Sequence, residues 1–250
     1  SAKKMIRNYI SQPFIVIGMH RSGTTLLANA LNDAGICMGV FRDHNGEAMH
    51  FLSLNQQLLW ADGANWMNPK LPSGNGVVLP SANEIYAEHI KSMSSNPLKL
   101  RLLHNAPWGW KDPRNTFSLK HWLHIFPEAK VIHVLRDGRD VALSLQARNS
   151  IKGEVFDEKL NNLDFNFALW EKYVAEGMRW KEQMGGRYFE IRYEDLLRPS
   201  GKELAALDAF TNKKVSSHIR AKPRKNRSYS ADLQTLAAES TVFNKLAYPL

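Results

Sequence analysis

The feature that most constrains the fold is an apolar run that ends at a glycine and is followed at once by a helical pattern. Phe14 to Ile17 is short, apolar and mostly β-branched, which predicts a buried strand that ends at Gly18. From Thr24 to Leu31 the apolar residues recur at helical spacing. A strand, a glycine-containing turn and a helix in this order direct backbone N–H groups toward an anion. We therefore expect an anion-binding loop at residues 18–25.

This loop differs from the nucleotide P-loop at one position. Gly18 and Gly23 bracket four residues, as in Gly-x4-Gly-Lys-Ser/Thr, but Thr24 stands where a P-loop has its lysine. In P-loop NTPases that lysine contacts the β- and γ-phosphates, with Mg²⁺ beside it. The cation of this loop is Arg21, whose permanently charged, forked guanidinium suits phosphate or sulfate oxygens. The pattern favours an anion site without the triphosphate apparatus; the alternative is a purely structural turn in which the arginine caps another group.

The chain is basic, which indicates an anionic partner. Its 250 residues are enough for one large α/β domain or two small ones, and its formal net charge is +9. A nucleotide, a nucleic acid, an acidic or sulfated substrate and an anionic membrane all suit that charge. Cys37 is the only cysteine, which excludes an internal disulfide and a cysteine-based zinc cluster and favours a reducing, cytoplasmic location. No apolar run approaches the roughly 20 residues of a membrane helix, so we expect no transmembrane segment.

Strand and helix patterns alternate along the chain, which is typical of a mainly parallel sheet flanked by helices. Further strands are expected at 108–110, 131–135 and 188–192. Helices are expected at 24–34, 47–60, 84–103 with an end or kink at Pro97, 116–125, 141–148, 163–184 and 200–212, the last being the final helix. Residues 61–83 form a long loop rich in Gly, Pro, Asn and Ser, and such loops are often lids or binding loops.

A second group of anion-binding side chains follows the third expected strand. Arg136 stands at the end of that strand, and Asp140 suits the N-cap or first turn of the next helix. Ser144 and Arg148 are four residues apart, so they share one face of the helix. Two guanidinium groups and a hydroxyl at a strand–helix junction would form a site for a phosphate monoester. A solvated ion-pair helix is one alternative; Mg²⁺ binding at Asp137, as in a P-loop kinase, is another, which the missing loop lysine disfavours.

Two further segments offer catalytic side chains. The turn-rich residues 42–46 precede a helical pattern, which predicts Glu47 in a helix first turn, where the helix dipole favours a carboxylate. Asp43 and His44 are rival bases, since histidine is the other common base near neutral pH. Lys111 follows the second expected strand, at the sheet edge where open α/β proteins bind ligands, although a solvent-facing lysine would fit the same pattern.

These segments resemble the sulfotransferases that use 3′-phosphoadenosine 5′-phosphosulfate (PAPS). Gly-Met-His-Arg-Ser-Gly-Thr-Thr at 18–25 resembles their 5′-phosphosulfate loop, in the arginine-containing form of bacterial sulfotransferases and protein-tyrosine sulfotransferases. The offsets from Arg136 to Ser144 and Arg148 match their 3′-phosphate motif. Three more segments resemble parts of these enzymes: Asn-Gly-Glu followed by Leu-Asn-Gln-Gln-Leu-Leu within 45–59, Trp-Gly-Trp-Lys-Asp-Pro-Arg at 108–114 and Arg-Tyr-Glu-Asp-Leu at 192–196.

The resemblance implies a single domain over residues 1–250 with a P-loop-like, three-layer α/β fold. Its core would span 13–197, and a basic loop at 213–228 would close over the nucleotide. The implied reaction moves a sulfuryl group from PAPS to a hydroxyl or amine of a small-molecule, carbohydrate, lipid or peptide acceptor, without a metal, and releases 3′-phosphoadenosine 5′-phosphate (PAP).

The resemblance also implies roles for particular residues. Glu47 would be the general base, Lys111 would neutralise charge on the leaving oxygen, and Arg21 would hold the transferred group. The nucleotide would be bound by His20, Arg21, Ser22, Gly23, Thr24, Thr25, Arg136, Ser144, Arg148 and Tyr193.

Two rival functions remain open at the level of sequence. One is a P-loop kinase, and the other is a non-enzymatic protein that binds polyanions through the basic segment 220–227. This segment could instead be a solvated tail or the loop that covers the nucleotide. Its cations are Arg220, Lys222, Arg224, Lys225 and Arg227. No aromatic interleaving or binding-module motif accompanies them, so we expect no nucleic-acid partner.

Overall fold

A computed structural model describes residues 11–39, 42–91, 106–151, 156–198, 201–220 and 228–250. Its centre is a sheet of four parallel strands in the order β2-β1-β3-β4. The strands are β1 (Phe14–Gly18), β2 (Gly109–Lys111), β3 (Lys130–Leu135) and β4 (Tyr188–Arg192). All four predicted strands are thereby confirmed to within a residue or two. Parallel strands covered on both faces are expected to be nearly continuous apolar runs, as β1 and β3 are.

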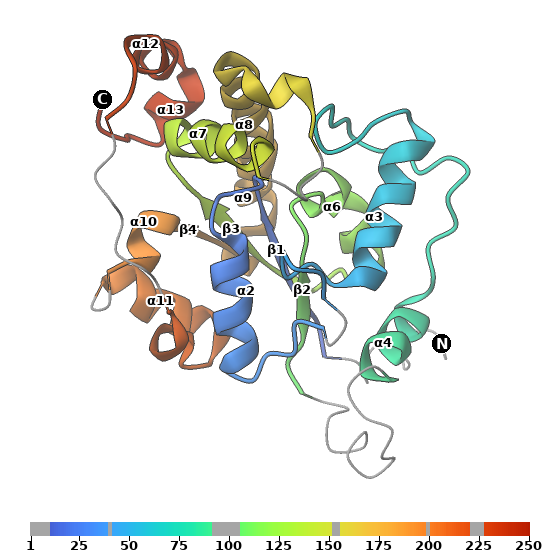
Figure 1. The fold of residues 1–250 in the computed structure, drawn as a ribbon. Helices are drawn as coiled ribbons and strands as arrows, with labels where there is room; N and C mark the ends of the chain where they lie inside the picture. The colour runs from blue at the N-terminus through green and yellow to red at the C-terminus, as the bar shows by residue number, and fades with distance from the viewer. Residues whose placement is uncertain (1–10, 40–41, 92–105, 152–155, 199–200, 221–227) are drawn as a thin grey trace.

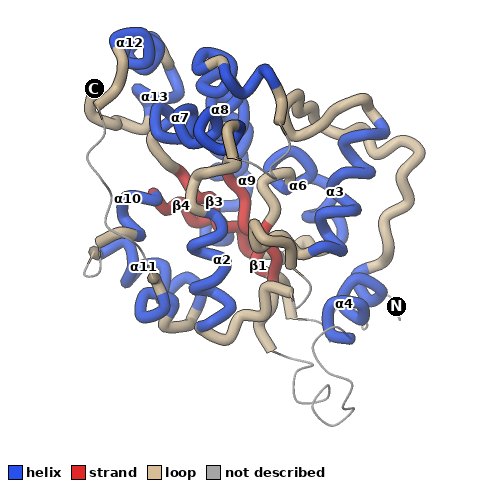
Figure 2. Tube along the Cα trace, viewed as in Figure 1, coloured by secondary structure: helices blue, strands red, loops and turns tan. Residues whose placement is uncertain are grey.

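Helices cover both faces of this sheet, as Figures 1 and 2 show. The α-helices are α2 (Thr24–Asp33), α3 (Met49–Ala61), α4 (Ala82–Lys91), α6 (Asn115–Ile125), α7 (Gly138–Asn149), α8 (Leu163–Met178), α9 (Trp180–Met184), α10 (Tyr193–Leu196), α11 (Lys202–Thr211), α12 (Ala231–Glu239) and α13 (Thr241–Lys245). Short 3₁₀ segments lie at Glu158–Asn161, Gly185–Arg187 and Val215–His218. The predicted three-layer α/β fold is confirmed.

The alternation of side chains along β1 separates two apolar layers. Phe14 and Val16 pack with residues of α2 and α11 on one face of the sheet. Ile15 and Ile17 pack on the other face with α3, α4, α6 and a group of stacked aromatic rings. The rings of Phe51 and Trp110 there are nearly parallel, with centroids 3.9 Å apart. This packing fixes α3 and α6 against β2, and both helices begin near the carboxyl end of that strand.

Two helix predictions were wrong in their boundaries. Glu47 does not lie in a first helical turn, because α3 begins only at Met49. The Oδ1 atom of Asp43 accepts the backbone N–H groups of Asn45 and Glu47, which holds this segment in a turn. The helix predicted over 163–184 is interrupted at Arg179, whose N–H is shared between two carbonyl groups.

The helix at 200–212 is not the last one, since α12 and α13 follow it. Ser230 and Ser240 cap them, each accepting the backbone N–H three residues later. The helix predicted over 84–103 corresponds to α4, and its part beyond Lys91, with Pro97, lies outside the described residues. The basic segment 220–227 also lies outside the described residues, apart from Arg220.

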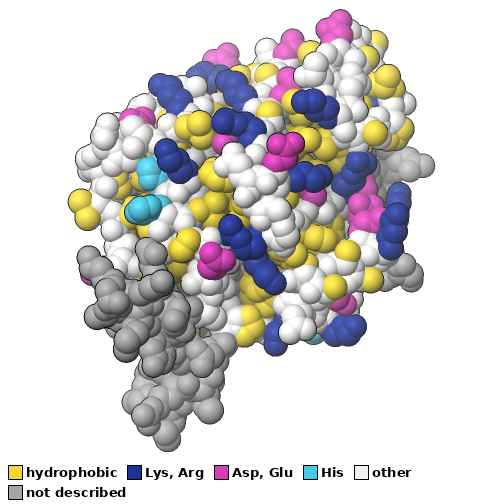
Figure 3. Space-filling model, turned by 180° about the vertical axis from the view of Figure 1, so that it is seen from behind, with side chains coloured by type: hydrophobic (Ala, Val, Ile, Leu, Met, Phe, Trp, Pro, Cys, Tyr) yellow, Lys and Arg dark blue, Asp and Glu magenta, His cyan; other side chains and the backbone are white. Residues whose placement is uncertain are grey.

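The surface charge is spread out on the face drawn in Figure 3. Lys and Arg side chains are scattered there, with Asp and Glu side chains between them. On this face, therefore, the positive charge does not gather into one basic stripe. Within the described ranges, none of the helices combines the length and apolar character needed to cross a membrane.

Candidate active site

A cavity of about 300 Å³ lies at the carboxyl ends of the strands. The loop after β1, the turns after β2 and β3, the start of α10 and the segment before α3 all contribute to its wall. In an open parallel sheet this edge is where ligands bind. All the residues predicted for the site line the cavity, apart from Ser22 and Ser144.

The loop after β1 presents backbone N–H groups and a helix N-terminus to the cavity. Arg21 has φ 68° and Gly23 has φ 90°, so both adopt the left-handed conformation. For a non-glycine residue such as Arg21 this conformation is strained and is typical of functional sites. The helix α2 begins at Thr24 and has no acidic residue in its first turn, so its positive dipole end is not neutralised there.

Gly23 also makes room for Tyr193, which follows β4 at the start of α10. A Cβ atom at Gly23 would lie 2.2 Å from the Tyr193 ring, so only glycine fits this close approach. The same ring lies under the guanidinium of Arg136, 4.4 Å from it. Tyr193 thus joins the loop after β1 to the turn after β3.

The two predicted anion-binding groups meet at Arg21. Its Nε donates to Oγ of Ser144 at 3.1 Å, and Nη1 of Arg136 donates to its carbonyl oxygen at 2.8 Å. The Nε atom of Arg136 is buried and has no hydrogen-bond partner within the described residues. Arg136 and Ser144 therefore border the loop after β1, as one bridging nucleotide would require.

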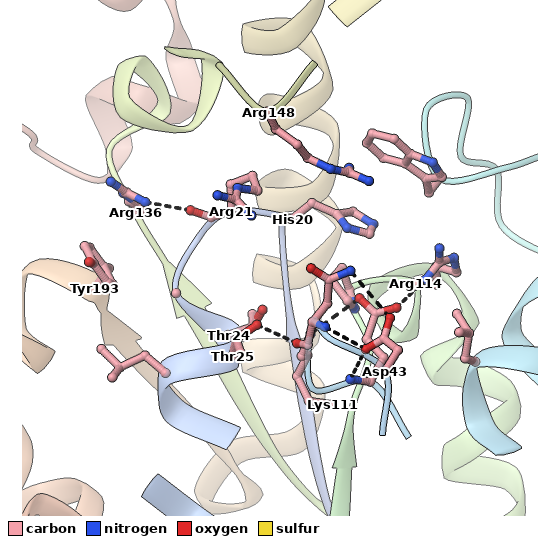
Figure 4. A pocket seen from close by; sticks show the side chains of 17 residues that line it. His20, Arg21, Thr24, Thr25, Asp43, Lys111, Arg114, Arg136, Arg148 and Tyr193 are labelled. Atoms are coloured by element: carbon pink, nitrogen blue, oxygen red, sulfur yellow. Dashed lines mark hydrogen bonds and ion pairs between the residues drawn. The ribbon is translucent and has the colours of Figure 1, made fainter. Parts of the chain in front are cut away.

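Arg148 and Ser22 lie differently from the rest of the predicted set. Figure 4 shows the side chain of Arg148 extending away from Arg136, on the other side of Arg21. The Arg148 guanidinium lies 5.6 Å from the ring of Trp66, a residue of the long loop 61–83. Ser22 is fully buried and points into the protein. The structure thus places Arg148 in the cavity wall but not beside Arg136.

Glu47 forms an ion-pair cluster with two cations at the end of β2. Its Oε1 lies 3.4 Å from Nζ of Lys111, and its Oε2 lies 3.0 Å from Nη1 of Arg114. Burial raises the pKa of Glu47 above its usual value, and Asp112 raises it further, whereas the two cations oppose this shift. Burial also lowers the pKa of Lys111, against the effect of the nearby carboxylates. A carboxylate with a raised pKa in a cavity is suited to accept a proton.

The rival bases are less favourably placed. Both Oδ atoms of Asp43 already accept hydrogen bonds, Oδ1 from two backbone N–H groups and Oδ2 from the side chain of Asn45. His44 is exposed and does not line the cavity. Of the three predicted bases, Glu47 is thus the buried one that faces the cavity.

His20 contributes a neutral imidazole to the wall. Burial lowers its pKa well below the usual value, and the nearby charges of Arg114 and Lys111 add to this effect. Its ring packs against Trp66 and Tyr173, with centroids 4.7 and 5.9 Å away. The side chain therefore shapes the cavity as an uncharged group.

Sequence reasoning did not assign a role to Arg114, Trp66 or Asn55. Arg114 is the last residue of the Lys-Asp-Pro-Arg segment, so the sequence placed it near the end of the strand. Nothing in the sequence indicated its contact with Glu47. Trp66 lies in the loop predicted as a lid or binding loop, which was the available signal. Asn55 is buried in α3, where nothing local marks a polar residue as functional. Across the described residues, no group of three or more His, Cys, Asp or Glu could hold a metal ion.

A family profile covers most of the chain. Residues 13–216 match the profile of the sulfotransferase family. A search of curated proteins gave no match for the sequence.

Several solved structures share the fold. The sulfotransferase domain of the olefin synthase from Synechococcus PCC 7002 is 16% identical, with a TM-score of 0.54 and 96% of each chain covered. A sulfotransferase from Alicyclobacillus acidocaldarius is 15% identical, with a TM-score of 0.53, covering 95% of this chain and 96% of that one. A sulfotransferase from Mycobacterium avium is 14% identical, with a TM-score of 0.51, covering 95% of this chain and 76% of that one.

Proposed function

Because the chain belongs to the sulfotransferase family, we propose that it transfers a sulfuryl group from PAPS to a hydroxyl or amine of an acceptor. The observation that carries this proposal is the junction of two anion-binding groups at the carboxyl edge of the sheet. The loop at 18–25 would hold the 5′-phosphosulfate, and Arg136 with Ser144 would hold the 3′-phosphate. A nucleotide with phosphate at both ends needs two such groups side by side.

The residues present fit such a ligand. The strained Arg21 and the N-terminus of α2 supply a cation and oriented N–H groups for the 5′ end. At the other end Arg136 has a buried Nε without a partner in the described part of the chain, and Tyr193 supports its guanidinium. The side chains of His20, Thr24 and Thr25 complete the wall on the loop side. Arg148 remains a prediction for the 3′-phosphate, because it would have to turn away from Trp66 to reach it.

When bound, PAPS supplies the sulfuryl group: the acceptor oxygen bonds to sulfur while the bond from sulfur to the 5′-phosphate oxygen breaks, and its electron pair leaves with PAP. Lys111 stands at the strand end and would stabilise negative charge on that leaving oxygen. Glu47 would take the proton of the acceptor. Fixed donors in the cavity and correct positioning would contribute most of the rate enhancement.

The acceptor is proposed only by chemical class, as a small molecule, carbohydrate, lipid or peptide that carries a hydroxyl or amine. The cavity wall also includes Leu52, Trp66 and Pro113, so a partly apolar acceptor would find contacts there. A peptide tyrosine is one member of this set and is not favoured over the others.

Binding of PAP without metal tests the proposal most directly. We expect PAP to raise the melting temperature in the presence of a chelator, and ATP with Mg²⁺ to have a much smaller effect. Arg21→Ala should weaken PAP binding by roughly 10- to 100-fold, since hydrogen bonds to charged groups contribute about 1.5–3 kcal/mol. The matched control is Arg198→Ala, because Arg198 is 73% exposed and lies outside the cavity. Stabilisation by ATP with Mg²⁺ alone would favour the kinase alternative, and unchanged PAP affinity in Arg21→Ala would contradict the site.

A further inference from the structure

Arg114 joins two buried carboxylates. Its Nη1 lies 3.0 Å from Oε2 of Glu47 and 2.9 Å from Oδ1 of Asp112. The backbone N–H of Arg114 donates to the same Oδ1 atom at 2.9 Å. Asp112 is fully buried and Arg114 is 9% exposed, so solvent screens these contacts little. Asp112 is therefore the fixed partner of Arg114, and Glu47 is the partner that faces the cavity.

Asn55 of α3 holds Asp112 from the side opposite to Arg114. Its Nδ2 donates to Oδ2 of Asp112 at 2.9 Å. Its Oδ1 accepts from Oγ of Ser118 at 2.6 Å and from Nε1 of Trp122 at 2.9 Å, which fixes the orientation of the amide. Both oxygens of Asp112 are thus occupied by groups on rigid elements. This support allows Arg114 to keep one position while substrates bind in the cavity and products leave it.

The charges in this cluster cancel before and after the proposed proton transfer. Glu47 and Asp112 are balanced by Lys111 and Arg114. During the reaction Lys111 would turn its charge to the leaving oxygen, and Glu47 would become neutral by taking a proton. Arg114 and Asp112 would then still form a balanced pair, and an unbalanced buried charge would be strongly destabilising.

The two oxygens of the Glu47 carboxylate are not equivalent. Oε2 is held by the guanidinium of Arg114 at 3.0 Å, whereas Oε1 has the longer contact of 3.4 Å with Lys111. Burial alone would lower the pKa of Arg114, but Asp112 and Glu47 raise it above its usual value, so this cation stays charged. Oε1 is consequently the oxygen that becomes available when Lys111 turns to the leaving group.

We propose that Arg114 is a positioning residue for sulfuryl transfer: with Asp112 as its permanent counterion, it orients Glu47, keeps that carboxylate ionised and leaves Oε1 to take the proton. The inference rests on the proposed function. In the step concerned, the acceptor proton passes to Oε1, the acceptor oxygen bonds to sulfur, and the electron pair of the breaking sulfur–oxygen bond stays with PAP.

The groups that face Glu47 set the sign of the expected pH effects. Arg114 and Lys111 favour the ionised carboxylate, whereas Asp112 and Asp43 disfavour it, as does burial. Loss of the Arg114 charge should therefore raise the pKa of Glu47 further. Loss of the Asp112 charge should lower it, because the two cations would remain.

The experiment is a pH titration of the protein with ¹³C-labelled glutamate, read by NMR, with the Glu47 signal assigned by its loss in Glu47→Gln. We expect Arg114→Gln to move the midpoint upward by about one pH unit or more, a tenfold change in proton affinity. Asp112→Asn should move it downward, and Arg114→Lys should restore most of the wild-type value. Opposite shifts from two variants of one ion pair cannot result from a general loss of stability.

Arg139→Gln is the matched control, because Arg139 forms an equally buried pair with Asp137 away from Glu47. Its Glu47 midpoint should equal that of the wild type. An unchanged midpoint in Arg114→Gln, shifts of the same sign in Arg114→Gln and Asp112→Asn, or an equal shift in the control would overturn the proposal. If Arg114→Gln does not fold, a downward shift in Asp112→Asn supports the proposal, and an unchanged or upward midpoint in that variant overturns it.

PAP binding separates this inference from the proposed function. We expect PAP to bind Arg114→Gln within about threefold of the wild type, because Arg21, Ser144 and Arg136 contact one another, whereas Arg114 contacts Glu47 and Asp112. If the wild-type protein does not bind PAP, the proposed function is contradicted. The pH titration of Glu47 would still test whether Arg114 positions this carboxylate. A loss of PAP affinity in Arg114→Gln as large as in Arg21→Ala would instead place Arg114 in the nucleotide site and overturn the positioning role.

Discussion

The turns after β2 and β3 are built alike but their arginines have different partners. Each turn consists of a cation at the strand end, an aspartate, one further residue and an arginine: residues 111–114 and 136–139. In each, Oδ1 of the aspartate accepts the backbone N–H of the arginine at 2.9 Å, and the two side chains form a buried ion pair. In each, the strand-end cation lines the cavity.

The arginine at the last position of each turn, Arg114 or Arg139, distinguishes them. The guanidinium of Arg114 also contacts Glu47 in the cavity, whereas the guanidinium of Arg139 contacts the C-terminal part of the chain. Arg139 donates to Oε1 of Gln234 at 2.6 Å and to the carbonyl oxygen of Pro249 at 2.5 Å, with its guanidinium 4.2 Å from the ring of Tyr229. The same local chemistry thus reaches the proposed base Glu47 from one turn and residues Gln234 and Pro249 from the other. Local sequence sets the turn, and the distant partner sets its role.

The largest effect on stability is expected from the turn after β3. Arg139→Gln should lower the free energy of unfolding by about 3–5 kcal/mol, because it leaves the carboxylate of Asp137 buried without its partner. Urea denaturation would measure this. Arg179→Gln is the control, since the Arg179 side chain is 64% exposed and its ion pair with Glu176 should contribute less than about 1 kcal/mol. Equal effects of the two substitutions would show that the Asp137–Arg139 pair is not a structural anchor.

The strand-end cations should separate binding from catalysis. Arg136→Ala should weaken PAP binding by roughly 10- to 100-fold, equivalent to about 1.5–3 kcal/mol, whereas Lys111→Ala should chiefly lower kcat. Calorimetric titration with PAP and steady-state rates with an identified acceptor would test this division. Arg148→Ala should change PAP affinity less than Arg136→Ala, because Arg148 lies against Trp66. A larger loss in Arg148→Ala would assign Arg148 to the 3′-phosphate.

Substitution of the third residue in each turn, Pro113 or Gly138, should lower the stability by smaller and unequal amounts. A Cβ atom at Gly138 would lie 2.6 Å from the Trp170 ring, so Gly138→Ala should destabilise the protein by about 1–3 kcal/mol. Pro113→Ala should cost only about 0.4–1 kcal/mol, mainly by allowing the unfolded chain more freedom. Thermal unfolding of both variants would compare them. Equal losses of stability in the two variants would mean that the Trp170 ring shifts to accommodate the added methyl group.

Local patterns predicted the parts of the fold that depend on neighbouring residues. The strands, the glycine loop and the strand-end cations Lys111 and Arg136 follow from apolar runs and from the residues that end them. The start of α3 was misjudged because it depends on hydrogen bonds to Asp43. The partners of Arg114 and Arg148 could not be predicted, since Glu47 and Trp66 are far away in the chain and are brought close only by the fold.

The neutral cluster around Glu47 has a consequence for the effect of ionic strength. Its four charges compensate one another inside the protein, so mobile ions gain little by approaching them. The partly exposed cations of the proposed nucleotide site would attract a multivalent anion, and dissolved salt weakens such attraction. Added salt should consequently raise the KM for PAPS while leaving kcat nearly constant, so that one variable of the buffer separates capture of the donor from the chemical step.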